Sequence, residues 1–205
     1  MVPDYWLSAC KQLSKQDPVL RKLIKTYPGI SLQSRGNAFQ TLARAIVGQQ
    51  ISVKAAESIW LRVLSTVKII KPVNILKAPT ENLRAAGLSY RKVEYLQDLA
   101  KHFQEKLIIE SQWPHLSDDE IIQDLVRVKG IGRWSAEMFL MFYLTRPDVF
   151  PIDDIGLQRA IQLHYNDGQS MTRNTMRTIG ESWRPWCTVA TWYLWRSLDP
   201  IPVEY

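Results

Sequence analysis

The sequence is poor in cysteine. Its 205 residues include two cysteines, Cys10 and Cys187. These lie far apart in the sequence and form no C-x-x-C or Cys/His pattern. A zinc site and an iron–sulfur cluster held by four cysteines are therefore excluded, and a disulfide framework is not expected. The three histidines, His102, His115 and His164, are scattered and form no metal-binding pattern, so the sequence predicts no metal site.

Long hydrophobic runs are also missing. No stretch of about 18 consecutive apolar residues occurs, so we expect no membrane-spanning helix. The first fifteen residues lack a basic segment followed by an apolar core, so we expect no signal peptide. These two absences predict a cytoplasmic protein, associated with the nucleoid if the source is bacterial.

Strand-like alternation is absent beyond a few residues, and helical spacing of apolar residues takes its place. Phe39, Leu42, Ala43 and Ile46 share one helical face, and Ser117 with Glu120 forms a capping box. The content of hydrophobic residues, 46%, suits a real core. We predict an all-α fold, with two helical lobes around a cleft in a single domain of residues 1–205. Expected helices include 90–106, 133–145, 154–165, 172–182 and 186–197.

Basic residues outnumber acidic ones, 26 to 20, which gives a formal net charge of +6. A modest basic excess is compatible with a nucleic-acid partner but does not prove one, because many soluble proteins share it.

The segment 125–136 predicts a turn between two helices within a hairpin of about 117–145. Gly130 and Gly132 flank Ile131. Both glycines would permit backbone angles closed to other residues and remove side chains from the surface of the turn. The amides that open the second helix have no intrahelical partner and can bind a phosphate, with charge added by Lys129 and Arg133. The alternative is a tight corner in which the glycines only permit close packing. The complete pattern LxxVxGIGxxSA with its basic flanks favours the DNA clamp. We therefore assign Lys129, Gly130, Ile131, Gly132 and Arg133 to DNA binding.

This pattern resembles the helix-hairpin-helix motif of a DNA glycosylase superfamily. Within it, the sequence is most similar to the alkylbase DNA glycosylases of the 3-methyladenine DNA glycosylase II type, over roughly residues 28–198. Larger members carry an N-terminal β-lobe that looks absent here. The matching pieces are Pro28-Gly29, residues 44–52, the hairpin, residues 150–156 and residues 183–195.

The resemblance implies a catalytic aspartate after a proline-containing loop, and Asp154 occupies that position. Cleavage of an N-glycosidic bond leaves a sugar with oxocarbenium character, which a carboxylate beneath it stabilises. An alkylated purine is already cationic and can leave with little help from a general acid. Asp is also a common N-cap residue. We assign the N-cap to Asp153 and catalysis to Asp154. This choice rests on the position of the catalytic aspartate in the family pattern, because the residues alone do not distinguish the two neighbours.

Trp134 indicates which reaction to expect. Bifunctional family members carry a lysine at this position, whose amine attacks the sugar and forms a Schiff base. Tryptophan cannot do so, and we therefore predict a monofunctional glycosylase without lyase activity.

The resemblance also assigns residues to the flipped nucleotide. Gln50 matches the position of the wedge that enters the duplex, although it could equally cap a helix end. Trp134 and Met138 share one helical face at i and i+4, and Trp195 matches an aromatic position of the family's lesion pocket. We assign all three to the base pocket, where aromatic rings attract a cationic base, although aromatic residues at helical spacing usually belong to the core. We expect the other three nearby tryptophans to belong to the core: Trp183, Trp186 and Trp192.

These assignments imply an enzyme whose partner is double-stranded DNA containing damaged bases. We expect a monomer that requires no cofactor, with room for a monovalent cation at the hairpin when DNA is bound. A non-catalytic helix-hairpin-helix module that tethers a repair complex to DNA is the alternative. This alternative accounts for the hairpin and the basic charge, but it does not explain an aspartate at position 154 after the proline-containing loop.

Overall fold

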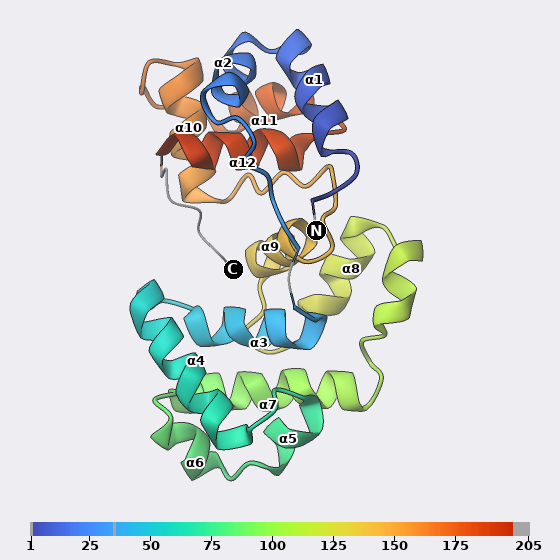
Figure 1. Cartoon of the computed structure of the whole chain (residues 1–205), viewed down its shortest axis with the longest axis vertical. Coiled ribbons are helices and arrows are strands. Elements are labelled where there is room, and N and C mark those ends of the chain that lie inside the picture. The colour runs from blue at the N-terminus through green and yellow to red at the C-terminus, as the bar shows by residue number, and fades with distance from the viewer. Residues whose placement is uncertain (1, 35, 199–205) are drawn as a thin grey trace. The chain divides into compact units, whose positions relative to one another are not determined.

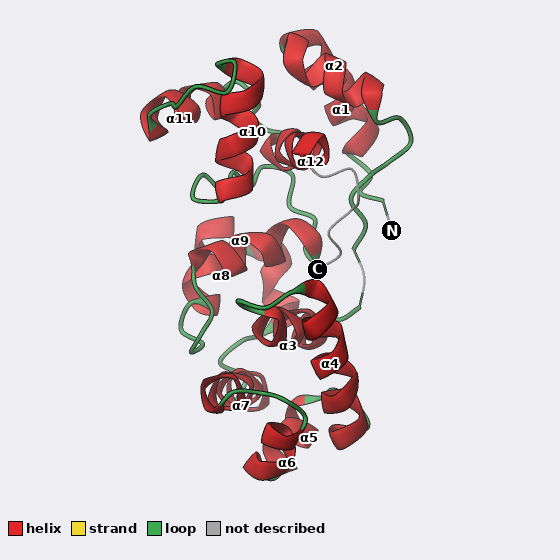
Figure 2. Ribbon diagram, turned by 90° about the vertical axis from the view of Figure 1, so that its left-hand side faces the viewer, coloured by secondary structure: helices red, strands yellow, loops and turns green. Residues whose placement is uncertain are grey.

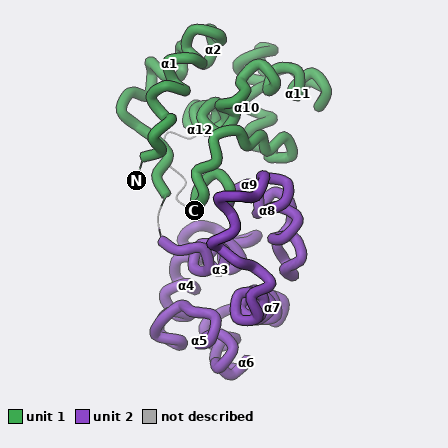
Figure 3. Tube along the Cα trace, turned by 90° about the vertical axis from the view of Figure 1, so that its right-hand side faces the viewer, with its two compact units in different colours: residues 1–35, 140–204 green, residues 36–139, 205 purple. Residues whose placement is uncertain are grey.

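The computed structural model describes residues 2–34 and 36–198, and every regular element in these ranges is a helix (Figures 1 and 2). The all-α prediction is therefore confirmed. None of the described helices combines the length and the apolar character needed to cross a bilayer. The chain divides into two compact units, residues 1–35 with 140–204 and residues 36–139 with 205 (Figure 3).

The first unit joins helices from both ends of the sequence. It contains α1 (Trp6–Gln16), α2 (Pro18–Thr26), α10 (Ile155–Tyr165), α11 (Arg173–Glu181) and α12 (Cys187–Leu198). Helix α12 is its centre: every residue from Cys187 to Leu194 is buried, and the helix packs against α1, α2 and α10. An apolar surface on all sides of a helix is what a central position requires.

A buried carboxylate links the two ends of the sequence in this unit. Asp17 caps α2 by accepting hydrogen bonds from the backbone N–H groups of Val19 and Leu20. Its second oxygen accepts the hydroxyl of Tyr165 at 2.6 Å and the indole N–H of Trp183 at 3.2 Å. Because every oxygen has a donor, this polar group can be buried at little cost.

The second unit contains α3 (Ala38–Gly48), α4 (Val53–Val67), α5 (Pro72–Lys77), α6 (Thr80–Ala85), α7 (Tyr90–Gln104), a 3-10 helix (Glu110–His115) and α8 (Asp118–Leu125). Helix α7 packs against α3, α5 and α6. The predicted apolar face of α3 is buried, and the Ser117–Glu120 capping box that opens α8 is present. These two predictions are confirmed.

Helix α9 (Arg133–Phe142) begins in the second unit and ends in the first. It is three residues shorter than the predicted helix 133–145. The physical reason is the backbone of Thr145, which has φ of +51°, so the chain leaves the helical path before Pro147.

The tryptophans expected in the core differ in burial. Trp183 and Trp192 are buried, as predicted. Trp186 is only half-buried: its indole N–H donates to Gln12 at 2.6 Å and its ring stacks on Tyr5. A polar edge directed to the surface is a common arrangement for tryptophan.

Candidate active site and DNA-binding hairpin

Asp154 is the N-cap of α10. Its backbone is extended, with φ of −71° and ψ of 120°, and its Oδ1 accepts the backbone N–H of Leu157 at 2.7 Å. The assignment of the cap to Asp153 was therefore wrong. Asp153 is exposed and pairs with Arg173 at 2.6 Å. The helix starts one residue later than expected because a turn precedes it, in which the N–H of Asp154 donates to the carbonyl of Pro151.

Trp195 and Asp154 are brought together by α12 and α10. The indole N–H of Trp195 donates to the same Oδ1 atom at 2.8 Å. The ring stacks on Phe142, with 6.0 Å between centroids and 10° between planes. Two N–H donors and the N-terminus of a helix thus stabilise negative charge on this carboxylate.

Gly156 gives these two side chains their space. A Cβ atom at this position would lie 3.1 Å from Oδ1 of Asp154 and 3.4 Å from the indole nitrogen of Trp195. Glycine is therefore part of the site, although the spacing of the sequence alone assigned it no role.

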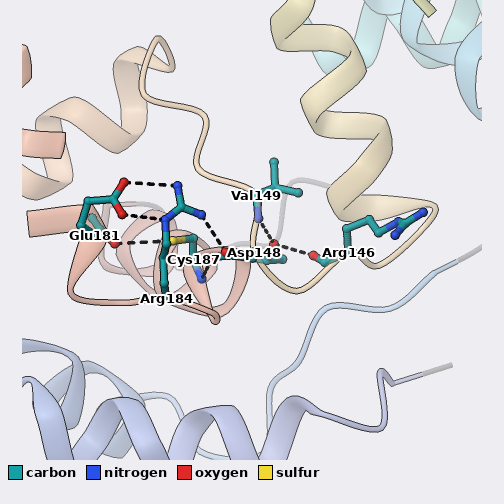
Figure 4. Close-up of polar contacts among 8 residues, drawn as sticks. Arg146, Asp148, Val149, Glu181, Arg184 and Cys187 are labelled. Carbon is teal, nitrogen blue, oxygen red and sulfur yellow. Dashed lines mark hydrogen bonds and ion pairs between the residues drawn. The ribbon is translucent and has the colours of Figure 1, made fainter. Parts of the chain in front are cut away.

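The loop that leads to Asp154 is fixed to the start of α12 by Asp148 (Figure 4). One oxygen of Asp148 pairs with the guanidinium of Arg184 at 2.7 Å, and the other accepts the backbone N–H of Cys187 at 3.4 Å. Arg184 also pairs with Glu181 at 2.8 Å. Burial raises the pKa of the Cys187 thiol, and the carboxylate of Asp148 adds to the effect, so this cysteine stays protonated and is a poor nucleophile.

Two further contacts hold the same loop. The hydroxyl of Thr188 accepts the N–H of Val149 at 3.0 Å and donates to the carbonyl of Arg146 at 2.6 Å. Phe150 packs against Gly180, where a Cβ atom would lie 2.5 Å from its ring. No local pattern in the sequence predicts these pairings, because they join segments about 30 to 40 residues apart.

The hairpin between α8 and α9 needs its two glycines for different reasons. Gly130 has φ of +81°, and a Cβ atom there would lie 2.1 Å from the ring of Tyr95. Gly132 does not adopt the left-handed region, so the conformational freedom of glycine is not used at that position. A Cβ atom at Gly132 would meet nothing within 4 Å. The absence of a side chain at Gly132 therefore leaves this surface of the turn open.

Both predicted basic residues of the hairpin have acidic partners. The ammonium of Lys129 pairs with Glu94 at 2.6 Å, and this carboxylate raises the pKa of Lys129. Arg133 pairs with Glu137 at 3.0 Å and with Asp119 at 3.2 Å. The Lys129 and Arg133 side chains remain more than half exposed, so a polyanion could compete for them.

Gln50 lies in an exposed turn directly after α3, with φ of +58°. The C-cap of α3 is Gln49. Within residues 2–34 and 36–198, no hydrogen bond to the Gln50 side chain is present, so the structure gives no support for the capping alternative. Its role as a wedge stays a prediction.

Trp134 and Met138 lie one turn apart on α9 and differ in exposure. Trp134 is 39% exposed, whereas Met138 is 5% exposed. Both belong to the second compact unit, and their assignment to the base pocket stays a prediction. Among the described residues, no group of three or more His, Cys, Asp or Glu side chains is arranged to hold a metal ion.

Comparison with known protein families gives one match that covers most of the chain. Residues 43–185 match the family described as HhH-GPD superfamily base excision DNA repair protein. The match includes the hairpin, the loop at Asp148 and the N-cap at Asp154.

Individual relatives agree with this family. A DNA-3-methyladenine glycosylase of Schizosaccharomyces pombe is 33% identical over 183 residues, which cover 87% of this chain and 80% of the relative. The crystal structure of a DNA-3-methyladenine glycosidase from Bacillus halodurans has a TM-score of 0.87 and 35% identity, covering 93% of this chain and 89% of that one. A structure of an S. pombe 3-methyladenine DNA glycosylase in complex with abasic DNA has a TM-score of 0.80 and 31% identity, covering 96% of this chain and 100% of that one. The chain spans 63% to 66% of the length of three other curated relatives.

Proposed function

Because the chain belongs to the HhH-GPD superfamily of base excision DNA repair proteins, we propose that it is a monofunctional DNA glycosylase that removes alkylated purines such as 3-methyladenine. Hydrolysis of the N-glycosidic bond is the proposed reaction, and damaged double-stranded DNA is the proposed partner. The observation that carries the proposal is the Asp154 carboxylate, held at the start of α10 by the Leu157 and Trp195 N–H groups. The names of the relatives described above support the choice of lesion.

The chemistry follows from that carboxylate. As the bond to the base breaks, positive charge develops on the deoxyribose, and a fixed anion beside the sugar lowers the energy of this transition state. The same carboxylate can orient a water molecule or accept its proton. The departing alkylated purine takes the electrons of the bond and loses its own positive charge, so the reaction needs no second carboxylic acid.

The hairpin is the proposed grip on the DNA backbone. The bare surface at Gly132 and the start of α9, where the first backbone N–H groups of a helix have no intrahelical partner, suit a phosphate, and this contact carries no sequence information. Lys129 and Arg133 are proposed to exchange their carboxylate partners for phosphates when DNA binds. Ile131 lies between the glycines and packs inward, which fixes the turn.

The remaining assignments concern the flipped nucleotide. Gln50 is proposed to fill the space that the nucleotide leaves in the duplex, and Trp134, Met138 and Trp195 are proposed to contact the base. Each ring over a cationic base contributes about 0.5–2 kcal/mol, which favours alkylated purines over normal ones. Trp134 supplies no amine, and we therefore propose that the enzyme has no lyase activity.

The proposal is tested by incubating the purified chain with randomly methylated duplex DNA in the presence of EDTA and identifying the products. We expect free methylated purines, intact abasic strands and no adduct trapped by borohydride. Because no cofactor is proposed, EDTA should not reduce the yield. A trapped adduct would establish the lyase instead. Tight binding without release of any base would leave only the non-catalytic DNA-binding module.

A further inference from the structure

The turn that carries Gln50 is fastened to α7 by a lysine. The ammonium of Lys92, in the first turn of α7, donates to the carbonyl of Val47 at 2.7 Å and to the carbonyl of Gln49 at 2.8 Å. These carbonyls lie at the end of α3, where the last backbone oxygens of a helix lack intrahelical partners and carry partial negative charge. A positive group is therefore well placed there.

The same turn is fastened to the hairpin. The side-chain amide of Gln49 donates to the carbonyl of Gly130 at 2.8 Å. Gln49 thus connects its neighbour Gln50 with the glycine that closes the hairpin turn.

Helix α7 also holds the hairpin directly. Tyr95, one turn after Lys92, packs against Gly130, and Asp98 accepts the backbone N–H of Lys129 at 2.9 Å. Lys92, Tyr95 and Asp98 follow at intervals of three residues and so lie along one side of the helix. One side of α7 therefore contacts both the turn of Gln50 and the hairpin.

From these contacts we propose that Lys92 is a positioning residue, which holds the Gln50 wedge in fixed register with the phosphate-binding hairpin. The inference rests on the proposed function. A side chain that fills a gap in the duplex must resist being pushed back while the hairpin holds the strand, so a rigid link between the two turns is useful. Gln50 also needs such support because it adopts a left-handed backbone without being glycine.

The environment of Lys92 agrees with a permanent contact. Burial lowers the pKa of Lys92, so placing the charged ammonium at this position is unfavourable by itself. The hydrogen bonds to two carbonyl oxygens offset that cost. The opposing view is that Lys92 only caps α3 and stabilises the fold, and the two views differ in what happens when Gln50 is removed.

The test is a double-mutant cycle on single-turnover excision from a methylated duplex, with Lys92→Met, Gln50→Gly and the combination. We expect Lys92→Met to lower the excision rate about tenfold or more, a loss of the size found when a hydrogen-bonded charged group is removed. In the Gln50→Gly background, the same substitution should change the rate less than about twofold, because the wedge that it positions is gone. Lys92→Arg should restore most of the activity. Lys101→Met, at an exposed position on the same helix, is the matched control and should behave as the wild type.

Each outcome has a consequence. An excision rate unchanged by Lys92→Met, or losses that multiply in the combined variant, would overturn the inference and leave the proposed glycosylase intact. Absence of excision by the wild type would instead reject the proposed function. Should Lys92→Met fail to fold, Gln49→Ala removes the contact with Gly130 and must show the same dependence on Gln50.

Discussion

At the scale of single residues, Asp154 has two roles, as a helix cap and as the proposed catalytic group. It caps α10 through the N–H of Leu157, and the same carboxylate is the proposed catalytic group. Replacement by alanine would therefore mix a loss of helix stability with a loss of chemistry. Asparagine keeps an oxygen that can accept the Leu157 N–H, so it separates the two effects.

Trp195→Phe tests whether the indole N–H supports the carboxylate. Phenylalanine can keep the stacking on Phe142 but cannot donate to Asp154. A hydrogen bond to a charged group contributes about 1.5–3 kcal/mol, so we expect the single-turnover excision rate to fall roughly 10- to 150-fold. Binding of undamaged duplex should not change. Trp186→Phe, which loses an N–H bond to Gln12, is the control, and an equal loss in both variants would argue against a specific role for Trp195.

At the scale of elements, the hairpin shows how two neighbouring glycines differ. Gly130 is required by its backbone angle and by the ring of Tyr95, whereas Gly132 stands in open space. Gly130 is therefore needed for the fold, whereas Gly132 allows a ligand to approach the backbone.

Alanine at each glycine separates these roles. Gly130→Ala should destabilise the fold by about 1–3 kcal/mol through backbone strain and overpacking. Gly132→Ala should change the stability by no more than about 0.5 kcal/mol, as is usual at an unobstructed surface position. Its added methyl group should nevertheless weaken duplex binding about tenfold by keeping a phosphate from the amides. Thermal unfolding and titration with undamaged duplex measure the two effects. Equal affinity of Gly132→Ala and wild type would remove the hairpin from the DNA contact.

At the scale of the whole molecule, the sequence predicts the helices well and their contacts poorly. Apolar spacing identified the buried face of α3, and Ser117 with Glu120 identified the start of α8. Such signals lie within one turn of a helix and are readable from neighbours in the chain.

The contacts that build the site are of another kind. Asp148 with Arg184, Asp154 with Trp195, and Lys92 with the end of α3 join residues tens of positions apart. Side-chain type alone does not choose among the many possible partners at such distances. The neighbours Asp153 and Asp154 could also not be told apart, because both are good capping residues and the turn before them decides.

The charge of the whole molecule predicts how binding responds to salt. With a formal net charge of +6, we expect the affinity for undamaged duplex to fall linearly with salt concentration on logarithmic axes. Each phosphate contact contributes a slope of about 0.9, so Lys129→Met should reduce the slope by that amount. Lys11→Met, an exposed lysine on α1, should leave the slope unchanged. A wild-type slope for Lys129→Met would mean that Lys129 keeps Glu94 as its partner when DNA binds.

The most direct measurement compares Asp154→Asn with Asp153→Asn in single-turnover release of methylated purines from duplex DNA. The two variants remove one negative charge each from adjacent positions, and both leave a side chain able to accept a hydrogen bond. Loss of the electrostatic group at the reacting centre should slow Asp154→Asn about 100-fold or more, with duplex affinity retained. Asp153→Asn, which only loses its ion pair with Arg173, should match the wild type. Equal rates for Asp154→Asn and wild type would contradict the account.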